Sequence, residues 1–281
     1  MSNPSAALVI GAGYLSTFLV DALPGDGPVI AVRRTALPAG GAVRVRPLAC
    51  DVTAADAART LASALRGFDG TVFILLPPSG LGAGAPAATL APLFSALATT
   101  RARGVVLASS TGVYDEGGDA RVSAATQPAP VSARAKRLAD IEQAWRGSGL
   151  PCRIVRLAGL YGPGRIIGWD AIAEGGALPG DPAGWLNLVR AEDAAAALCA
   201  AACAAEEDAP YLISDGTPVR RRDYYACLAQ LAGRPLPAFD PGRARRGGSR
   251  RCDPSDSWRR LGLQPRYPDF RASLRDLLTT A

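Results

Sequence analysis

The chain has 281 residues, of which 48% are hydrophobic and 20% charged, and its 31 basic and 25 acidic side chains give a formal net charge of +6. This composition predicts a soluble globular protein with a large core. The chain has no histidine, which excludes a Ser-His or Cys-His nucleophile, and it has no run of 18 apolar residues that would predict a membrane span.

The cysteines and the first residues predict a reducing, cytoplasmic setting. The six cysteines are scattered without a Cys-x-x-Cys pair, so we expect neither a disulfide framework nor a metal site. The N-terminal segment has no basic stretch followed by an apolar one, so no signal peptide is predicted. Arginine-rich stretches at 220–222 and 242–251 could contact nucleic acid, but in an arginine-rich chain we interpret them as solvated loops. We therefore expect no nucleic-acid or membrane partner.

Short apolar runs that predict strands alternate with segments that predict helices. Strands are predicted at 6–12, 29–34, 43–50, 71–77, 104–110 and 152–159, and helices at 14–23, 54–66, 86–102, 132–147, 190–205, 222–232 and 268–279. The alternation predicts an α/β fold with a Rossmann-type, doubly wound parallel sheet. We assign residues 1–160 to a dinucleotide-binding domain, to which 186–215 return. Residues 161–281 form mainly a smaller substrate-binding part.

The stretch "GAGYLS" lies between the first predicted strand and the first helix. Gly11 permits a tight turn, Gly13 lets a pyrophosphate approach the backbone, and Ser16 replaces the third glycine of the dinucleotide fingerprint. Tyr14 and Leu15, which lead into the helix, are further candidates for cofactor binding. The pattern predicts a dinucleotide site, with a plain glycine turn as the alternative.

The end of the second predicted strand distinguishes between the two nicotinamide dinucleotides. An acidic residue there would bind the ribose 2′-hydroxyl of NAD(H), but this chain has Arg33 and Arg34. Guanidinium groups bind phosphate in a bidentate manner. The sequence therefore favours NADP(H) as cofactor, and solvated arginines are the alternative interpretation.

Further candidates for cofactor binding follow the other predicted strands. Open α/β sheets bind ligands at the carboxyl ends of their strands. The candidates there are Asp51 and Val52 after the third strand, Leu76, Pro77 and Pro78 after the fourth, Ser109 in the fifth and Gly159 after the sixth.

Several motifs in fixed order carry a family resemblance. They are "GAGYLS", "SSTGVY", "RLAGLYGPGR", "LNLVRAEDAAAAL", "YLISDGTPVRRRDYY" and "RLGLQPRYPDFRASLRDLL". The chain resembles an atypical extended short-chain dehydrogenase/reductase of the NAD-dependent epimerase/dehydratase superfamily, in the branch with a Gly-x-Gly-Tyr-Leu start. The resemblance implies that Ser110 hydrogen-bonds the reacting carbonyl or hydroxyl and that Lys136 binds the nicotinamide ribose. It also implies that Asp193 is a structural cap, and Arg190 stands where the motif often has histidine.

One residue departs from the family pattern. The tyrosine expected four residues before the lysine is Ser132. In the family that phenol is the general acid or base, and a serine hydroxyl is a poor replacement for it. Another group could supply the proton, with Tyr114, Tyr161, Asp115 and Glu116 as candidates. A second possibility is a substrate that needs no strong acid, such as a protonated imine. A third is that the chain binds NADP(H) without turnover.

Lys136 is the single lysine among 31 basic residues. Only lysine offers a compact ammonium for ribose hydroxyls, so its presence here favours an intact cofactor site. We expect an NADP(H)-dependent oxidoreductase that reduces a carbonyl or imine of a small metabolite. The alternatives are a nucleotide-sugar-type epimerase/dehydratase and a non-catalytic NADP(H)-binding regulator. Relatives often pair through the helix that holds the lysine, which implies a homodimer.

Overall fold

The computed structural model describes residues 6–35, 44–115, 117, 119–205, 209–242 and 249–279. The chain packs as two compact units. The first comprises residues 1–109, 137–155 and 198–210, and the second 110–136, 156–197 and 211–281. These ranges reflect packing alone, so the expected division near residue 160 into a dinucleotide-binding domain and a substrate-binding part stays a prediction.

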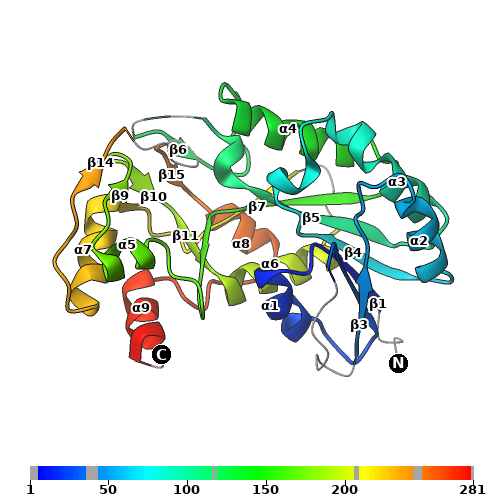
Figure 1. The fold of residues 1–281 in the computed structure, drawn as a ribbon, viewed down its shortest axis with the longest axis horizontal. Helices are drawn as coiled ribbons and strands as arrows, with labels where there is room; N and C mark the ends of the chain where they lie inside the picture. Colours follow the sequence, from blue (N-terminus) through cyan, green and yellow to red (C-terminus); the bar gives the residue numbers. More distant parts are fainter. Residues whose placement is uncertain are drawn as a thin grey trace. The chain divides into compact units, whose positions relative to one another are not determined.

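A seven-stranded sheet with the order β12-β7-β5-β4-β1-β2-β3 organises the fold (Figure 1). Its strands are β1 (Ala6–Ile10), β2 (Val29–Arg33), β3 (Val45–Ala49), β4 (Gly70–Ile74), β5 (Gly104–Ser110), β7 (Cys152–Leu157) and β12 (Tyr211–Ile213). β1 pairs in parallel with β2 and β4, β2 with β3, and β4 with β5. The predicted Rossmann-type fold class is therefore confirmed. The first six strands were predicted from the sequence, whereas β12 was not, because three apolar residues are too short a run to show a period.

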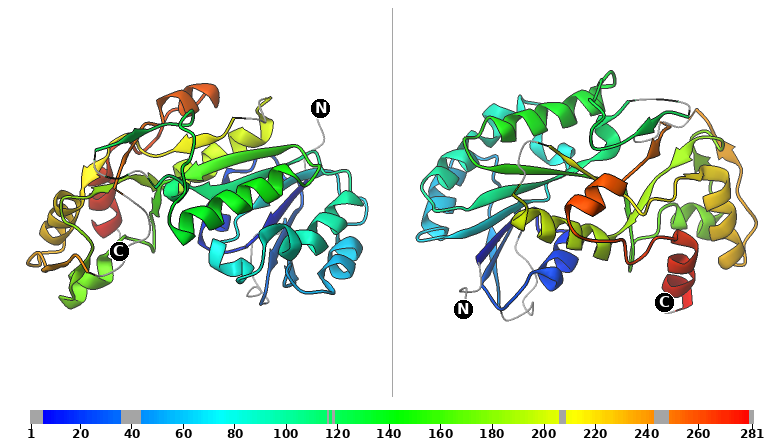
Figure 2. Two further views of the ribbon diagram at one scale, coloured as in Figure 1. Left: turned by 90° about the horizontal axis from the view of Figure 1, so that it is seen from above. Right: turned by 180° about the vertical axis from the view of Figure 1, so that it is seen from behind.

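Helices cover both faces of this sheet. They are α1 (Tyr14–Ala22), α2 (Ala57–Ala64), α3 (Pro86–Ala98), α4 (Ala133–Arg146) and α6 (Ala191–Cys203). Because side chains alternate along a strand, Leu8 and Ile10 of β1 face the same core as Leu93 of α3 and Trp145 of α4. Figures 1 and 2 show α2, α3 and α4 on that face of the sheet and α1 on the opposite face.

The second unit consists of short elements around its own core. They are η2 (Thr111–Val113), β6 (Arg121–Val122), β8 (Gly159–Tyr161), α5 (Trp169–Glu174), β9 (Leu178–Pro179), β10 (Trp185–Leu186), β11 (Leu188–Arg190), β13 (Val219–Arg220), α7 (Arg221–Leu231), β14 (Phe239–Asp240), β15 (Arg251–Cys252), α8 (Ser255–Arg260) and α9 (Phe270–Thr279). Tyr224 and Tyr225 of α7 pack there with Phe270 and Leu274 of α9. In the described part of the chain, no helix is both long and apolar enough to cross a membrane.

Candidate functional site

The glycine turn after β1 has the shape that a dinucleotide pyrophosphate requires. Gly11 has φ +94°, and a Cβ there would lie 2.9 Å from the carbonyl carbon of Leu75. A Cβ at Gly13 would instead meet only the Gly11 carbonyl oxygen, at 3.9 Å. Gly13 precedes α1, and among the described residues no side chain caps this helix end. Open space over backbone N–H groups at a helix N-terminus suits a phosphate, so the residues present fit the cofactor.

Ser16 shows why a serine can replace the third glycine of the fingerprint. Its side chain is buried, and its hydroxyl donates a hydrogen bond of 2.5 Å to the Gly13 carbonyl oxygen. The bond ties the first turn of α1 to the glycine turn. The side chain therefore packs under the turn and leaves the surface above Gly13 open.

The candidates for the adenosine half lie at the ends of β2 and β3. Arg33 and Arg34 are both exposed, so their guanidinium groups can reach a 2′-phosphate. The side chain and backbone N–H of Thr53 hydrogen-bond Asp51, and these bonds, aided by the charge of Arg34, hold the pKa of that carboxyl below its usual range. Val52 is buried. The roles of these residues stay predictions.

Ser110 is the last residue of β5 and begins the short turn η2. Its Oγ accepts a hydrogen bond of 3.0 Å from the Gly112 backbone N–H. A hydroxyl that accepts one bond still has its own proton to donate. This geometry suits the expected role of Ser110 toward a reacting oxygen or nitrogen. By contrast, the neighbouring Ser109 hydroxyl donates to Oε1 of the buried Glu142 at 2.7 Å, so its side chain serves the packing of α4 against β5.

Ser132, at the position of the family tyrosine, caps the helix that carries the lysine. Its Oγ accepts a hydrogen bond from the Ala135 backbone N–H at 3.2 Å and donates one to Oδ1 of Asp115 at 3.0 Å. Oδ2 of Asp115 accepts the backbone N–H groups of Val131 and Ser132, both at 2.6 Å. A serine that bonds the third residue after it is an N-cap. Ser132 and Asp115 therefore hold the start of α4.

We expect Ser132→Ala to lower the free energy of unfolding by about 1 kcal/mol, because the helix loses its N-cap. We expect cofactor affinity and turnover to stay within about twofold of wild type, since the hydroxyl is bonded within the cap and is a poor general acid. Urea unfolding and NADPH titration measure the two quantities. Ser132→Thr keeps the cap and is the matched control. A tenfold loss of turnover at unchanged stability would instead assign Ser132 to the chemistry.

The structure places both candidate phenols in the interior. Tyr114 is fully buried, and its hydroxyl donates to the Ser123 carbonyl oxygen at 2.9 Å and accepts from Arg156 at 2.7 Å. Tyr161 is also fully buried, and desolvation raises its pKa far above the usual value. We expected both at the rim of a site, but their hydroxyls lie inside the second unit. This arrangement argues against either phenol as the proton donor.

The two acidic candidates for the proton donor are Asp115 and Glu116. Burial raises the pKa of Asp115, but hydrogen bonds from the backbone and side chain of Ser132 and the backbone of Val131 lower it more, so the net shift is downward. Asp115 is therefore a carboxylate at neutral pH and has no proton to donate. Glu116 lies outside the described residues. None of the three described candidates is thus suited to act as a general acid at neutral pH.

Lys136 lies in the first turn of α4 with an exposed side chain. Its backbone N–H donates to the Ser132 carbonyl oxygen at 3.0 Å. The ammonium is thus presented to solvent from a helix end that Ser132 and Asp115 fix in place.

Gly159 begins β8, where a Cβ would lie 3.0 Å from the Asn187 carbonyl oxygen, so glycine allows the close approach of these two segments.

Leu76, Pro77 and Pro78 lead from β4 into the short helix η1 (Pro78–Leu81). Leu76 and Pro78 are half-buried, whereas Pro77 is exposed. Arg137 of α4 contacts the loop that follows η1 through backbone carbonyl groups. The apolar surface of this segment suits the ring of a bound nucleotide, and its role stays a prediction.

The helix-start motif of α6 serves structure. The Asp193 carboxylate accepts the backbone N–H groups of Arg266 at 2.9 Å and Tyr267 at 3.0 Å. Asp193 therefore ties the start of α6 to the segment at residues 266–267, which is a structural role as expected. Arg190, where relatives often have histidine, is buried, pairs with Glu192 at 3.1 Å, and its guanidinium carbon lies 3.9 Å from the centre of the Tyr267 ring.

Sequence reasoning missed a buried carboxyl group, that of Asp215. Its side chain is 4% exposed, and Oδ1 accepts the Thr217 backbone N–H at 2.9 Å. Desolvation raises the pKa of Asp215 to about 8, against the lowering effect of the Thr217 bond. Oδ2 is buried without a hydrogen-bond partner among the described residues. The carboxyl therefore carries a proton at neutral pH in the folded chain.

We expect the stability of the protein to fall between about pH 4 and pH 8 because of Asp215. In this window the folded chain keeps a proton that the unfolded chain releases, so each pH unit lowers the free energy of unfolding by up to about 1.4 kcal/mol. Above pH 8 both states are ionised and the effect levels off. Asp215→Asn should remove this slope in urea unfolding from pH 5 to pH 9.

Asp181→Asn is the matched control for this experiment. Asp181 is exposed, and its Oδ1 likewise accepts a backbone N–H, that of Ala183, at 2.9 Å. The control should keep the wild-type slope. A slope that also persists in Asp215→Asn would show that other groups cause it.

In the described part of the chain, no three or more cysteine, aspartate or glutamate side chains gather in a way that could hold a metal ion. The first unit presents the glycine turn and the exposed Arg33 and Arg34 at the end of β2, and the second presents Ser110 at the end of β5 and the exposed Lys136 on α4. Groups of these kinds can bind and orient a nicotinamide dinucleotide and its substrate, and their roles here stay predictions.

Comparison with known proteins gives relatives in sequence and in structure. No family model matches the chain. Protein YeeZ of Escherichia coli strain K12 is 33% identical over 174 residues, and this match covers 59% of this chain and 59% of YeeZ. The chain thus spans less than two thirds of the curated relative that it matches.

Solved structures match over nearly the whole chain. A functionally unknown conserved protein from Silicibacter pomeroyi is 26% identical, with a TM-score of 0.77 and coverage of 98% of this chain and 99% of that one. MoeE5 in complex with UDP-glucose and NAD is 25% identical, with a TM-score of 0.78 and coverage of 98% and 97%. UDP-glucuronic acid 4-epimerase from Bacillus cereus, in complex with UDP-glucuronic acid and NAD, shares the fold at 18% identity, with a TM-score of 0.78 and coverage of 98% and 99%.

Proposed function

From the Rossmann-type fold that this chain shares with NAD-dependent epimerases and dehydratases, we propose that it is an NADP(H)-dependent oxidoreductase acting on a small metabolite. The fold supports a nicotinamide dinucleotide as cofactor, because members of this structural group bind NAD. Exposed Arg33 and Arg34 at the end of β2 support the phosphorylated form, since each can bind a 2′-phosphate.

One observation carries the choice of substrate class. Ser110 offers a hydroxyl and Lys136 an ammonium, but Ser132 caps a helix at the position where the resembled family has its acid, and the described alternatives for that acid are buried or ionised. A carbonyl needs a proton at its oxygen as hydride arrives at carbon, whereas a protonated imine already carries its proton on nitrogen. We therefore favour an imine as the group that is reduced.

The reaction balances without a protein acid. A bound NADPH would supply a hydride, which is two electrons and one proton, to the imine carbon and would itself become NADP⁺. The C=N double bond becomes a single bond, its electron pair neutralises the cationic nitrogen, and the product is an amine. Ser110 would orient the substrate through its hydroxyl, and Lys136 would hold the nicotinamide ribose. Both tasks are positioning, which brings the reacting carbon and hydride together.

The test is oxidation of NADPH, followed by its absorbance, with a panel of cyclic imines and the ketones that match them in shape. We expect consumption of NADPH with imines and release of an equal amount of amine. Reduction of ketones alone would contradict the imine assignment. Tight NADPH binding without oxidation across the panel would favour the non-catalytic regulator.

MoeE5 favours a second candidate, a nucleotide-sugar epimerase or dehydratase. MoeE5 is 25% identical and was solved with UDP-glucose and NAD. Such an enzyme returns the hydride to its substrate, so it keeps its cofactor and shows no net NADPH oxidation. Cofactor that copurifies and exchanges slowly, together with conversion of a nucleotide sugar, would support this candidate over the first.

Two further expectations belong to the same proposal. Copies of the chain would pair through α4, as the family resemblance implies, and light scattering in solution tests this. The protein would also work in the cytoplasm, where its six free cysteines would stay reduced. Fractionation of cells that express the chain tests the second expectation.

A further inference from the structure

A glycine-rich loop follows the β4 segment that is expected to contact the cofactor. Gly80 lies in η1, Gly82 and Gly84 lie between η1 and α3, and Gly82 has φ +62°. Glycine has more backbone freedom to lose than other residues, so such a loop is ordered only if other groups hold it. Two apolar side chains help to hold it, because Leu81 within the loop and Pro86, which follows it at the start of α3, are both buried.

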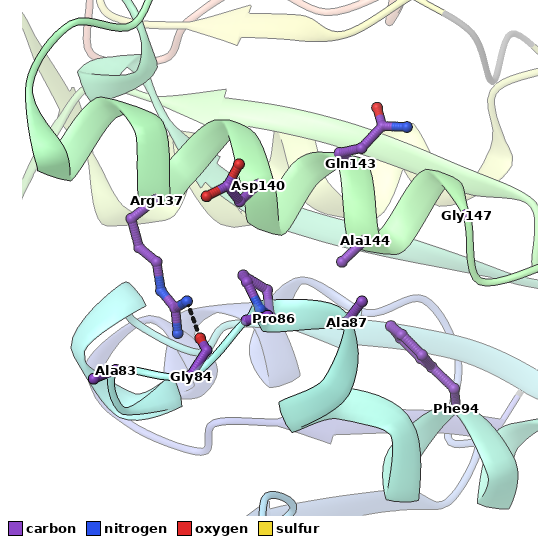
Figure 3. A pocket seen from close by; sticks show the side chains of 11 residues that line it. Ala83, Gly84, Pro86, Ala87, Phe94, Arg137, Asp140, Gln143, Ala144 and Gly147 are labelled. Atoms are coloured by element: carbon purple, nitrogen blue, oxygen red, sulfur yellow. Dashed lines mark hydrogen bonds between the residues drawn. The ribbon is translucent and has the colours of Figure 1, made fainter.

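Arg137 of α4 holds the middle of this loop. Its Nη1 donates to the Gly84 carbonyl oxygen, and its Nη2 donates to those of Leu81 at 3.1 Å and Gly82 at 2.9 Å. Figure 3 shows the guanidinium extending from α4 to the loop, at one end of a groove between α4 and the start of α3. A planar guanidinium has five donors in a fixed geometry, so one side chain can bind three carbonyl groups at once.

The position of Arg137 in the chain links this contact to the cofactor site. Arg137 directly follows Lys136, and Leu76, Pro77 and Pro78 directly precede the loop that it holds. The loop therefore directly follows a segment that is expected to contact the cofactor, and the side chain that holds it directly follows the lysine that is expected to hold the nicotinamide ribose. Arg137 itself reaches backbone carbonyls of the loop, so its effect on a ligand is indirect.

We propose that Arg137 is a positioning residue that orders the loop at residues 79–85 and thereby slows release of the bound dinucleotide. The ordering of the loop stands on the contacts alone, whereas the effect on release rests on the proposed function. Loss of the three bonds frees a glycine-rich segment, and local opening of this kind exposes backbone to proteases and ligands to solvent.

The test compares Arg137→Met, which keeps the length of the side chain without donors, with Arg137→Lys, whose single ammonium cannot bind all three carbonyls. Gln143→Ala is the matched control, because Gln143 lines the same groove from the same helix. In protein freed of cofactor, proteinase K should cut within residues 79–85 about tenfold faster in Arg137→Met. Arg137→Lys should be intermediate, and the control should match wild type.

The second measurement is release of NADPH, followed by its fluorescence after rapid dilution into excess competitor. We expect release to be about tenfold faster in Arg137→Met, because charge-assisted hydrogen bonds that order the loop are lost.

Equal cleavage in wild type and Arg137→Met would overturn the ordering of the loop. Faster cleavage with unchanged release would overturn its effect on the cofactor. If wild type does not bind NADPH, the proposed function fails, and cleavage still decides the role of Arg137. Arg137→Lys gives both readouts if Arg137→Met does not fold.

Discussion

Lys136→Met is expected to weaken NADPH binding by about 100-fold and to lower turnover at least as much, because in the proposed site the ammonium would make charge-assisted bonds to the nicotinamide ribose. The side chain is exposed at the start of α4, and the cap formed by Ser132 and Asp115 fixes the backbone that carries it. The folded state should therefore tolerate the substitution, with an unchanged thermal midpoint.

Fluorescence titration with NADPH and steady-state oxidation of NADPH measure this effect. Lys136→Arg is the matched variant, since it keeps the charge but presents a larger planar group. We expect it to recover only part of the affinity. An unchanged affinity of Lys136→Met for NADPH would contradict the proposed binding of the nicotinamide ribose by Lys136. The single lysine of this arginine-rich chain would then have no explanation.

The double substitution Arg33→Asp with Arg34→Ser should reverse the preference for NADPH over NADH. Both arginines are exposed at the end of β2, so their removal affects the ligand more than the fold. The aspartate can accept hydrogen bonds from the ribose 2′-hydroxyl of NADH, and it repels a 2′-phosphate. We expect the ratio of the two affinities to change by at least about 100-fold.

Affinities for NADPH and NADH at two salt concentrations test this prediction, because bonds to the 2′-phosphate weaken as salt rises. Arg59→Ser is the control for a general change of charge, since Arg59 is an exposed residue of α2. A preference that stays unchanged in the double variant would show that the 2′-phosphate binds elsewhere or that NADP(H) is not the cofactor.

Much of the fold could be predicted because local patterns report it. The first six strands of the sheet along the chain are apolar runs between turn residues. The turn at residue 11 has a positive φ, which requires glycine, and the sequence motif already indicates this glycine. The strand β12 and the short pairs of the second unit have two or three residues each, so they depend on tertiary pairing and leave no periodic signal.

The candidate site was harder to predict, because the direction of a side chain is not a local property. The motif "SSTGVY" places Tyr114 near Ser110 in sequence, but the Tyr114 ring lies against Arg156 in the interior. The cap at Ser132 involves Asp115, which is 17 residues away. The burial of Asp215 likewise arises from segments that meet only in the folded chain.

Reduction of a protonated imine without a protein acid is the central claim, and a single-turnover experiment tests it most directly. NADPH bound to the protein is mixed with a cyclic imine or with its ketone analogue, and the loss of absorbance is followed from pH 5.5 to pH 8.5. We predict that the imine is reduced at least about 100-fold faster than the ketone and that its rate follows the protonation of the imine nitrogen. Equal rates for both substrates, with a pH dependence set by a group of the protein, would contradict the account.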